Sequence, residues 1–299
     1  MHLEMAQVFS AAESPASATA TPVSFANVHM DFGEGEVLRG VSFSVQDRET
    51  LVLLGETGTG KTLTLKLAAG LLKPTQGSIN VLDQEVSSMT EKELLVLRER
   101  LGFVFQEGAL FDSMTVGENV AYRLREEHVK EEEIEPRVSE VLKFVELEHT
   151  LDQLPSELSG GMRRRVSIAR ALINRPSIVL YDSPTAGLDP ITAQTIITLI
   201  LRLRDVYGVT ALLATQRLQD GFALANFHFD KAANRVVRNF AARSSANGMP
   251  PNSVRRNIDR KEDLSVTRFL VYRAGLIYFD GAPEELASSK DPYLQRFLV

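Results

Sequence analysis

A strand-like apolar run at 51–54 is followed directly by a glycine-rich octet and then by an apolar segment that suits a helix. The octet matches the pattern G-x-x-x-x-G-K-[ST] and consists of Gly55, Glu56, Thr57, Gly58, Thr59, Gly60, Lys61 and Thr62. Its glycines let backbone N–H groups turn toward phosphate oxygens at a helix N-terminus. In such a loop Lys61 contacts the terminal phosphates and the Thr62 hydroxyl binds Mg²⁺. The unit predicts a nucleotide-phosphate site, and the alternative is a chance glycine-rich turn.

Strand-like and helix-like segments alternate along most of the chain. Apolar strand-like runs occur at 51–54, 102–105, 177–182 and 209–215. A helix-like segment at 191–207 separates the last two of them. Strands joined through helices predict an α/β fold with a parallel sheet and crossover connections. Two earlier segments, 22–32 and 41–45, alternate between apolar and polar residues and predict half-buried strands.

The composition is that of an ordinary globular protein, with 299 residues, 44% hydrophobic content and a formal net charge of −6. This charge provides no general basic surface, so we expect no nucleic-acid partner. The chain has no cysteine, which excludes disulfides and thiolate metal sites. Segment 190–201 is too short and too polar to span a membrane, so a membrane role requires a partner.

Three segments are predicted to lack a packed core of their own. Residues 1–21 are predicted to form a disordered tail, and 289–299 a C-terminal tail. Residues 231–266 mix Pro, Gly, Ser, Asn and charges without an apolar period, which indicates a flexible surface insertion. The acidic run 131–133 is interpreted as a solvated helix face.

Two further motifs follow the octet. Ser159, Gly160 and Gly161 open a helix, where exposed N–H groups can bind an anion. The alternative is an ordinary helix cap at Ser159. Farther along, the apolar run 178–181 ends in Asp182, as in a strand that presents a carboxylate to Mg²⁺.

In this order, the motifs resemble those of the ATP-binding cassette (ABC) ATPases over about 22–230 and again near 267–288. The resemblance implies a P-loop NTPase fold of the ABC type, an α/β domain over 22–288. Its core is a mainly parallel sheet, with an N-terminal antiparallel β-subdomain and an inserted helical subdomain at about 107–175. It implies ATP and Mg²⁺ as cofactors and a head-to-tail dimer of two cassettes, identical or different. ATP would lie between the phosphate loop of one cassette and Ser159 of the other.

The resemblance also assigns roles to single residues. Phe32 matches an aromatic that stacks on adenine, with a core phenylalanine as the alternative. Gln106 matches a glutamine that senses Mg²⁺ and the γ-phosphate, with a solvent-facing turn residue as the alternative. Asp182 and Thr62 match the Mg²⁺ ligands, and Asp189 lies in the segment that touches the other cassette.

A narrower likeness concerns the cargo. Segments 106–127 and 183–192 resemble the cassettes of Mla/Mce-type systems, which move phospholipids or other lipids between membranes. This resemblance implies an integral-membrane permease and an Mce-like lipid-binding partner. The chain would then lie in the cytoplasm, peripheral to the cytoplasmic face of the inner membrane.

Two positions depart from the family pattern. Ser183 stands where the family has the glutamate that polarises the attacking water, and Gln216 stands where it has a histidine. Phosphoryl transfer depends mainly on positioning and charge, so Gln216 could orient water through its amide. Asp220 is another candidate carboxylate on the water side, with a solvated helix residue as the favoured alternative.

Three functions follow from these observations. The first is the ATP-hydrolysing subunit of a transporter. The second is a cassette that binds ATP without hydrolysing it, for regulation, for assembly, or to complete a partner's site, and Ser183 and Gln216 favour it. The third, a soluble ABC ATPase acting on DNA or ribosomes, is disfavoured because this chain has one cassette and no basic bias.

Overall fold

The computed structural model describes residues 21–239 and 266–298. The predicted tail at 1–21 therefore lies outside the described residues apart from its last position, as does most of the predicted insertion at 231–266. None of the helices in the described ranges is long and apolar enough to cross a membrane.

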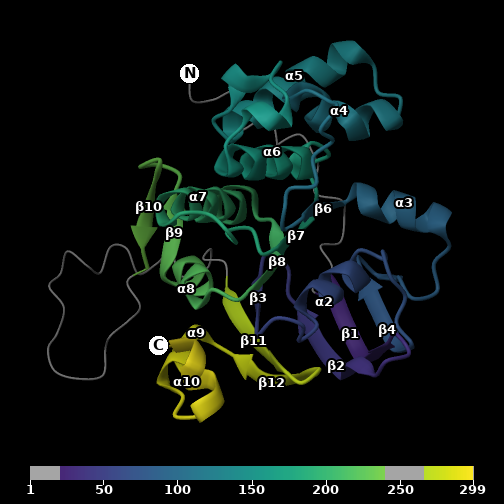
Figure 1. Ribbon diagram of the computed structural model, residues 1–299, viewed down its shortest axis with the longest axis vertical. Coiled ribbons are helices and arrows are strands. Elements are labelled where there is room, and N and C mark those ends of the chain that lie inside the picture. Colours follow the sequence, from purple (N-terminus) through teal and green to yellow (C-terminus); the bar gives the residue numbers. More distant parts are fainter. Residues whose placement is uncertain (1–20, 240–265, 299) are drawn as a thin grey trace, which may run out of the picture.

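A six-stranded sheet in the order β12-β11-β3-β8-β7-β6 forms the centre of the molecule (Figure 1). Its strands are β3 (Thr50–Leu54), β6 (Leu101–Val104), β7 (Ile178–Asp182), β8 (Thr210–Thr215), β11 (Thr267–Arg273) and β12 (Leu276–Gly281). All neighbours pair in parallel except β11 with β12. Every residue of β3, β7 and β8 is buried, because helices and the second sheet cover both faces. The prediction of a mainly parallel core is confirmed.

A smaller antiparallel sheet lies beside the first, in the order β2-β1-β4-β5. Its strands are β1 (Val23–Asp31), β2 (Glu36–Val45), β4 (Gln76–Val81) and β5 (Gln84–Glu85). Apolar residues of α2 (Lys61–Ala68) and α3 (Glu91–Glu99) share one buried cluster with this sheet and with part of the central sheet. Helix α2 thus fixes the phosphate loop that precedes it between the two sheets.

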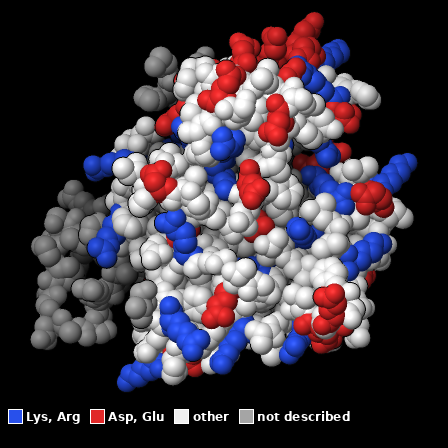
Figure 2. Space-filling model, in the orientation of Figure 1, with Lys and Arg blue, Asp and Glu red and all other residues white. Residues whose placement is uncertain are grey.

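The helical subdomain forms a separate layer at the top of Figure 1. It contains α4 (Val116–Glu126), α5 (Glu131–Phe144), two short 3₁₀ turns (Glu148–Thr150 and Pro155–Glu157) and α6 (Gly160–Leu172). These elements lie within 107–175, the range for which the sequence predicts an inserted helical subdomain. The first turn of α5 carries the acidic run 131–133, which is exposed, and acidic side chains gather at that end of the molecule in Figure 2.

The remaining elements are α7 (Pro190–Tyr207), α8 (Leu218–Asn226), β9 (Phe227–Asp230), β10 (Arg235–Arg238), α9 (Pro283–Ser288) and α10 (Pro292–Leu298). Two of them fall where irregular structure was predicted. Strand β10 lies inside the expected insertion and pairs with β9, which precedes it. Helix α10 occupies the expected C-terminal tail, because Tyr293 and Leu294 are buried against the domain and the Tyr293 hydroxyl donates to the Tyr272 carbonyl oxygen at 2.9 Å.

Candidate functional site

The candidate site lies where three neighbouring parallel strands end. Leu54 of β3 pairs with Thr215 of β8, and Asp182 of β7 pairs with Ala214 of β8. The residues that follow these strands therefore emerge at one edge of the sheet. This edge brings together the phosphate loop, the segment from Ser183 and the turn that begins at Gln216, which were far apart in the sequence.

The phosphate loop folds around its own lysine. The Lys61 ammonium donates to the carbonyl oxygens of Gly55 at 2.8 Å and Glu56 at 2.7 Å. Gly60, just before α2, has φ +103, and a Cβ there would stand 2.4 Å from a methyl of Leu38. A side chain is excluded at this position by both conformation and space.

Burial lowers the pKa of Lys61 to about 8, although the nearby carboxylates of Asp182 and Glu56 act in the opposite direction. The side chain is only 7% exposed. A buried ammonium loses hydration and is destabilised until an anion approaches. The loop therefore holds a cation whose charge a phosphate group would stabilise.

A hydroxyl and a carboxylate meet directly beside this lysine. The Thr62 hydroxyl donates to Asp182 Oδ1 at 2.9 Å, and Asp182 is 5% exposed. These are oxygen donors of the kind Mg²⁺ accepts, and Mg²⁺ is commonly held by one or two such groups together with substrate phosphates and water. The donor set fits that ion, and among the described residues no cluster of three or more His, Cys, Asp or Glu offers an all-protein metal site.

Gln106, the third predicted Mg²⁺ contact, lies on the turn after β6, where it is exposed. Two arginines of α6 hold this turn. Arg164 donates to the Phe105 carbonyl oxygen at 2.8 Å, and Arg170 donates to the carbonyl oxygens of Gly108 at 2.9 Å and Ala109 at 2.7 Å. The turn that carries Gln106 is thus tied to the helix that carries Ser159.

Ser159 caps α6, with its hydroxyl accepting from the Met162 N–H at 3.2 Å. This is the ordinary capping role that was the alternative to anion binding. Ser159 and Gly160 are nevertheless exposed, whereas a Cβ on Gly161 would stand 2.3 Å from a methyl of Thr192. Gly161 therefore has a packing role within the chain, and only the exposed end of the helix is available to a ligand.

Asp189 is the N-cap of α7 and accepts from the Ile191 N–H at 3.1 Å and the Thr192 N–H at 3.0 Å. Bonds from Thr192 hold the pKa of Asp189 below its usual value. Phe32, in the turn between β1 and β2, is 60% exposed, which excludes the alternative of a core phenylalanine. Both side chains remain accessible to a ligand or a second chain.

The two departures from the family pattern lie side by side at the strand ends. Ser183 has φ +48, and its N–H donates to the Ala214 carbonyl oxygen at 2.8 Å. Its hydroxyl lies 3.4 Å from Asp182 Oδ1. Gln216 follows β8 and is exposed at the same edge. The described contacts place Gln216 near the site without assigning it a partner there.

The interpretation of Asp220 as a solvated helix residue is wrong. Its carboxylate is 3% exposed and accepts hydrogen bonds from the hydroxyls of Thr185 and Thr215. Asp220 lies in the first turn of α8, and that turn packs inward against the strand ends. Thr185, Arg164 and Arg170 were not predicted as site residues, because their roles depend on contacts between distant segments.

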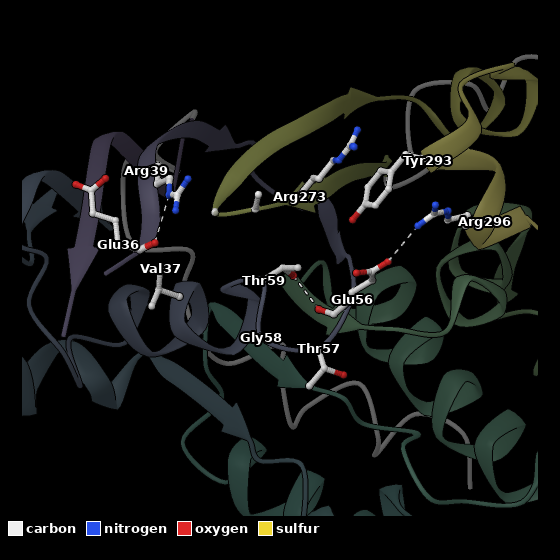
Figure 3. A pocket seen from close by; sticks show the side chains of 12 residues that line it. Glu36, Val37, Arg39, Glu56, Thr57, Gly58, Thr59, Arg273, Tyr293 and Arg296 are labelled. Atoms are coloured by element: carbon white, nitrogen blue, oxygen red, sulfur yellow. Dashed lines mark hydrogen bonds and ion pairs between the residues drawn. The ribbon is translucent and has the colours of Figure 1, made fainter. Parts of the chain in front are cut away.

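A pocket of about 540 Å³ flanks the phosphate loop (Figure 3). Glu56 to Thr59 form one wall, and the opposite wall comes from the start of β2, the β11–β12 turn and α10. Three arginines line it: Arg39, Arg273 and Arg296. Arg296 lies 4.0 Å from the Glu56 carboxylate, a contact between two exposed side chains. The pocket continues the phosphate-loop region toward the C-terminal helix.

Comparison with known proteins identifies related domains. Residues 38–186 match the family described as ABC transporter. Over 200 residues the chain is 40% identical to "Methionine import ATP-binding protein MetN 2" of Bacillus anthracis, a match covering 66% of this chain and 59% of that protein. It is 35% identical over 197 residues to "Methionine import ATP-binding protein MetN" of Bifidobacterium longum (strain NCC 2705), covering 66% and 49%.

These named relatives are methionine import proteins, so they do not support the narrower likeness to Mla/Mce-type lipid cassettes. The chain spans 59% of the length of the Bacillus anthracis relative.

Solved structures show the same architecture. The dimeric post-hydrolysis state of the ATP-binding cassette MJ0796, bound to ADP and Pi, aligns with a TM-score of 0.68 and 26% identity. That alignment covers 87% of this chain and 98% of the other. The cbiO1 structure from Clostridium perfringens, part of the ABC transporter complex cbiONQ, aligns at TM-score 0.71 with 24% identity, covers 93% of this chain and 94% of the other, and supports the fold alone. The chain has the ABC ATPase fold and carries an ATP-binding domain of the ABC transporter family.

Proposed function

We propose that this chain binds MgATP and hydrolyses it as the energy-supplying subunit of a membrane transporter. The contact between the Thr62 hydroxyl and Asp182 Oδ1 at 2.9 Å carries the proposal, because it joins the end of β7 to the first turn of α2 beside Lys61. A cation, a hydroxyl and a carboxylate at the N-terminus of a helix suit the terminal phosphates of a nucleotide and their Mg²⁺.

In the proposed mechanism, Lys61 leaves the carbonyl oxygens of Gly55 and Glu56 and pairs with the terminal phosphates. Thr62 and Asp182 supply oxygen ligands to Mg²⁺, which when bound neutralises charge on the transferring phosphoryl group. Gln216 orients the attacking water, since its amide can donate to phosphate and accept from water. Phe32 stacks on the base.

A second cassette completes the proposed site. Ser159 and Gly160 are exposed at the start of α6, so they are free to contact a nucleotide held by another chain. Gln106, exposed on its turn, is proposed to sense the nucleotide, and the exposed Asp189 to contact the other cassette. The partner cassette is a second copy or a different chain.

A second function is favoured by the lack of a general base at position 183, next to Asp182. Ser183 is not a base at neutral pH, and its hydroxyl faces Asp182 at 3.4 Å. Loss of a general base costs about 10²–10⁴-fold in rate. In this alternative the chain binds ATP for regulation or assembly, or completes the site of a partner that hydrolyses it.

For the cargo we propose lipids, because segments 106–127 and 183–192 resemble Mla/Mce-type cassettes. The proposed partners are an integral-membrane permease and an Mce-like lipid-binding protein. The chain itself would bind at the cytoplasmic face of the inner membrane. The methionine import relatives support the competing cargo, methionine. Purification of the chain with its permease, followed by mass spectrometry of co-purified lipids and by methionine uptake in vesicles, separates the two. Methionine uptake that depends on Lys61 would rule out the lipid proposal.

Hydrolysis is tested by phosphate release from the full chain, alone and with its permease. We expect turnover that Lys61→Ala abolishes and that Gln216→Ala lowers by about 10²-fold or more. Gln219→Ala is the matched control, because Gln219 is also exposed and lies three residues farther on. Nucleotide binding without any Lys61-dependent turnover would support the binding-only alternative.

A further inference from the structure

The buried carboxylate of Asp220 connects two segments that carry the unusual residues of the site. It accepts from the Thr215 hydroxyl at 3.3 Å and makes a short hydrogen bond with the Thr185 hydroxyl. Thr215 is the last residue of β8 and precedes Gln216. Thr185 lies two residues after Ser183. One side chain thus holds the backbone on both sides of the proposed water position.

Arg217 strengthens the same connection. Its backbone N–H donates to the Thr215 hydroxyl oxygen at 3.0 Å, and its guanidinium donates to the Thr185 carbonyl oxygen at 3.3 Å. Its Nε lies 3.6 Å from Asp220 Oδ1. The two neighbours of Gln216 are thus both connected to Thr185: Thr215 through Asp220, and Arg217 directly. These bonds restrict how far the backbone of Gln216 can move from the segment that begins at Ser183.

Folding alone does not require a carboxylate at this place. A buried carboxylate loses hydration, and burial raises the pKa of Asp220 although the two hydroxyls and Arg217 act in the opposite direction. A neutral polar side chain could satisfy the hydroxyls of Thr185 and Thr215 without that cost. Carboxylates with perturbed pKa values cluster at functional sites.

We propose that Asp220 is a positioning residue that holds the Gln216 turn at a fixed distance from the Ser183–Thr185 segment, so that Gln216 is aligned with the γ-phosphate and the attacking water. This proposal rests on the proposed function. It adds which residue holds Gln216 in place beside the attacking water. The proposed role requires no contact between Asp220 and the nucleotide. It acts through Thr185 and Thr215.

The effect should be specific for the γ-phosphate. Lys61 and the loop backbone also contact the β-phosphate, which ADP retains, and neither Lys61 nor Thr62 bonds to Asp220 in the described contacts. Loosening the Gln216 turn should therefore leave MgADP affinity unchanged. It should weaken binding of a non-hydrolysable ATP analogue, raise KM for ATP to a similar extent, and lower kcat. Misplacement of a positioning group by about 1 Å can cost about 10²-fold in rate.

The test compares Asp220→Ala, Asp220→Asn and Thr185→Val in the full chain. Calorimetry gives the affinities for MgADP and for Mg-AMPPNP, and phosphate release gives kcat and KM. We expect Asp220→Ala and Thr185→Val to lose the preference for the ATP analogue over ADP and about 10–10²-fold of kcat. Asp220→Asn should recover only part of both, because its amide oxygen still accepts from the hydroxyls but its neutral side chain loses the ion pair with Arg217. Gln219→Ala should match the wild type.

The outcomes separate this proposal from the proposed function. If wild-type chain shows no turnover, the affinity ratio still tests the role of Asp220. The proposal is overturned if Asp220→Ala and Thr185→Val keep the wild-type kcat and the wild-type ratio of analogue affinity to ADP affinity. It is also overturned if these two variants lose affinity for ADP and for the analogue equally, because Asp220 is then a purely structural residue. Thr185→Val keeps the side-chain shape and decides the matter if Asp220→Ala does not fold.

Discussion

The Arg164 guanidinium donates a hydrogen bond of 2.8 Å to the Phe105 carbonyl oxygen, and so joins α6 to the turn that bears Gln106. Arg164 is 6% exposed, and burial lowers its pKa although Asp182 and Glu107 act in the opposite direction. The charge of Arg164 is therefore close enough to the carboxylates of Asp182 and Glu107 to interact with both. Movement of α6 cannot occur without movement of that turn while the bond persists.

We expect Arg164→Met to loosen this turn. The substitution keeps the apolar stem but removes one of two donors to the Phe105 carbonyl oxygen, which also accepts from the Gly108 N–H at 2.9 Å. We expect a loss of about 0.5–1.5 kcal/mol of unfolding free energy. Hydrogen exchange of the amides at 105–109 should become faster. Arg137→Met is the control, since Arg137 is half-exposed and its ion pair with Glu133 spans 3.7 Å. Equal exchange at 105–109 in both variants would show that Arg164 does not hold the turn.

Local patterns predicted one part of the site and missed another for a physical reason. The octet 55–62 and the strand ending in Asp182 are continuous segments, so the residue types alone predicted that Thr62 and Asp182 serve one site. Asp220 has no such pattern around it. Its burial comes from Thr185, which is 35 residues away and belongs to another segment. No local pattern signals a contact of that kind.

The C-terminal helix illustrates the same difference. Residues 292–298 were too few to stand out as a helix, because a helix of two turns is not stable by propensity alone. Burial of Tyr293 and Leu294 against the domain stabilises it. The roles of Ser159 and Asp189 depend on a second chain, and they stay predictions.

Lys61 gives a prediction for pH. Its pKa of about 8 means that the free loop loses its cation above that pH, while a bound phosphate favours the protonated form. Affinity for MgADP should therefore be constant below pH 8 and fall by up to about tenfold per pH unit above it. Titration calorimetry from about pH 6.5 to about pH 9.5 measures this, a range that brackets the shifted pKa. Lys61→Met should bind weakly with no such dependence, and a wild-type affinity that stays unchanged across this range would contradict the assignment.

Lys61 also affects stability with a defined sign. Its pKa is lowered in the folded chain from 10.5 to about 8, so between these two values the unfolded chain binds more protons. The free energy of unfolding should rise with pH in this window through this group. Lys61→Met removes the buried ammonium, so the variant gains stability relative to the wild type wherever Lys61 would be charged. Urea denaturation of both proteins without nucleotide should show that this gain is larger at about pH 7 than at about pH 10.

Ser183→Glu should increase turnover. Ser183 already adopts φ +48, so the backbone cost of a side chain in this conformation is present in the wild type. A carboxylate here would lie at the end of β7 beside Gln216 and could accept a proton from water. We expect kcat to rise by about 10²-fold, the lower end of what a general base contributes. Ser183→Gln has similar size without basicity and should give no gain. An equal gain from both variants would point to sterics.

Gly221→Ala tests how the packing of α8 supports the site. Gly221 follows Asp220, and a Cβ there would stand 2.5 Å from a ring carbon of Phe269 and 3.1 Å from a methyl of Val52. Helix α8 can approach β11 and β3 closely because this residue has no side chain. In an exposed helix Gly→Ala stabilises by about 1 kcal/mol, but overpacking a core costs about 1–3 kcal/mol. We expect net destabilisation, measured by urea denaturation, with Gln219→Ala neutral or slightly stabilising.

The same substitution should displace Asp220, since the two residues share one helical turn. If Asp220 positions the Gln216 turn, Gly221→Ala loses the preference for the ATP analogue over ADP even at temperatures where the variant is fully folded. A variant that is destabilised but keeps that preference would show that α8 can shift outward without moving the carboxylate. In that case the bond from Thr185, rather than the packing of Gly221, fixes the position of Asp220.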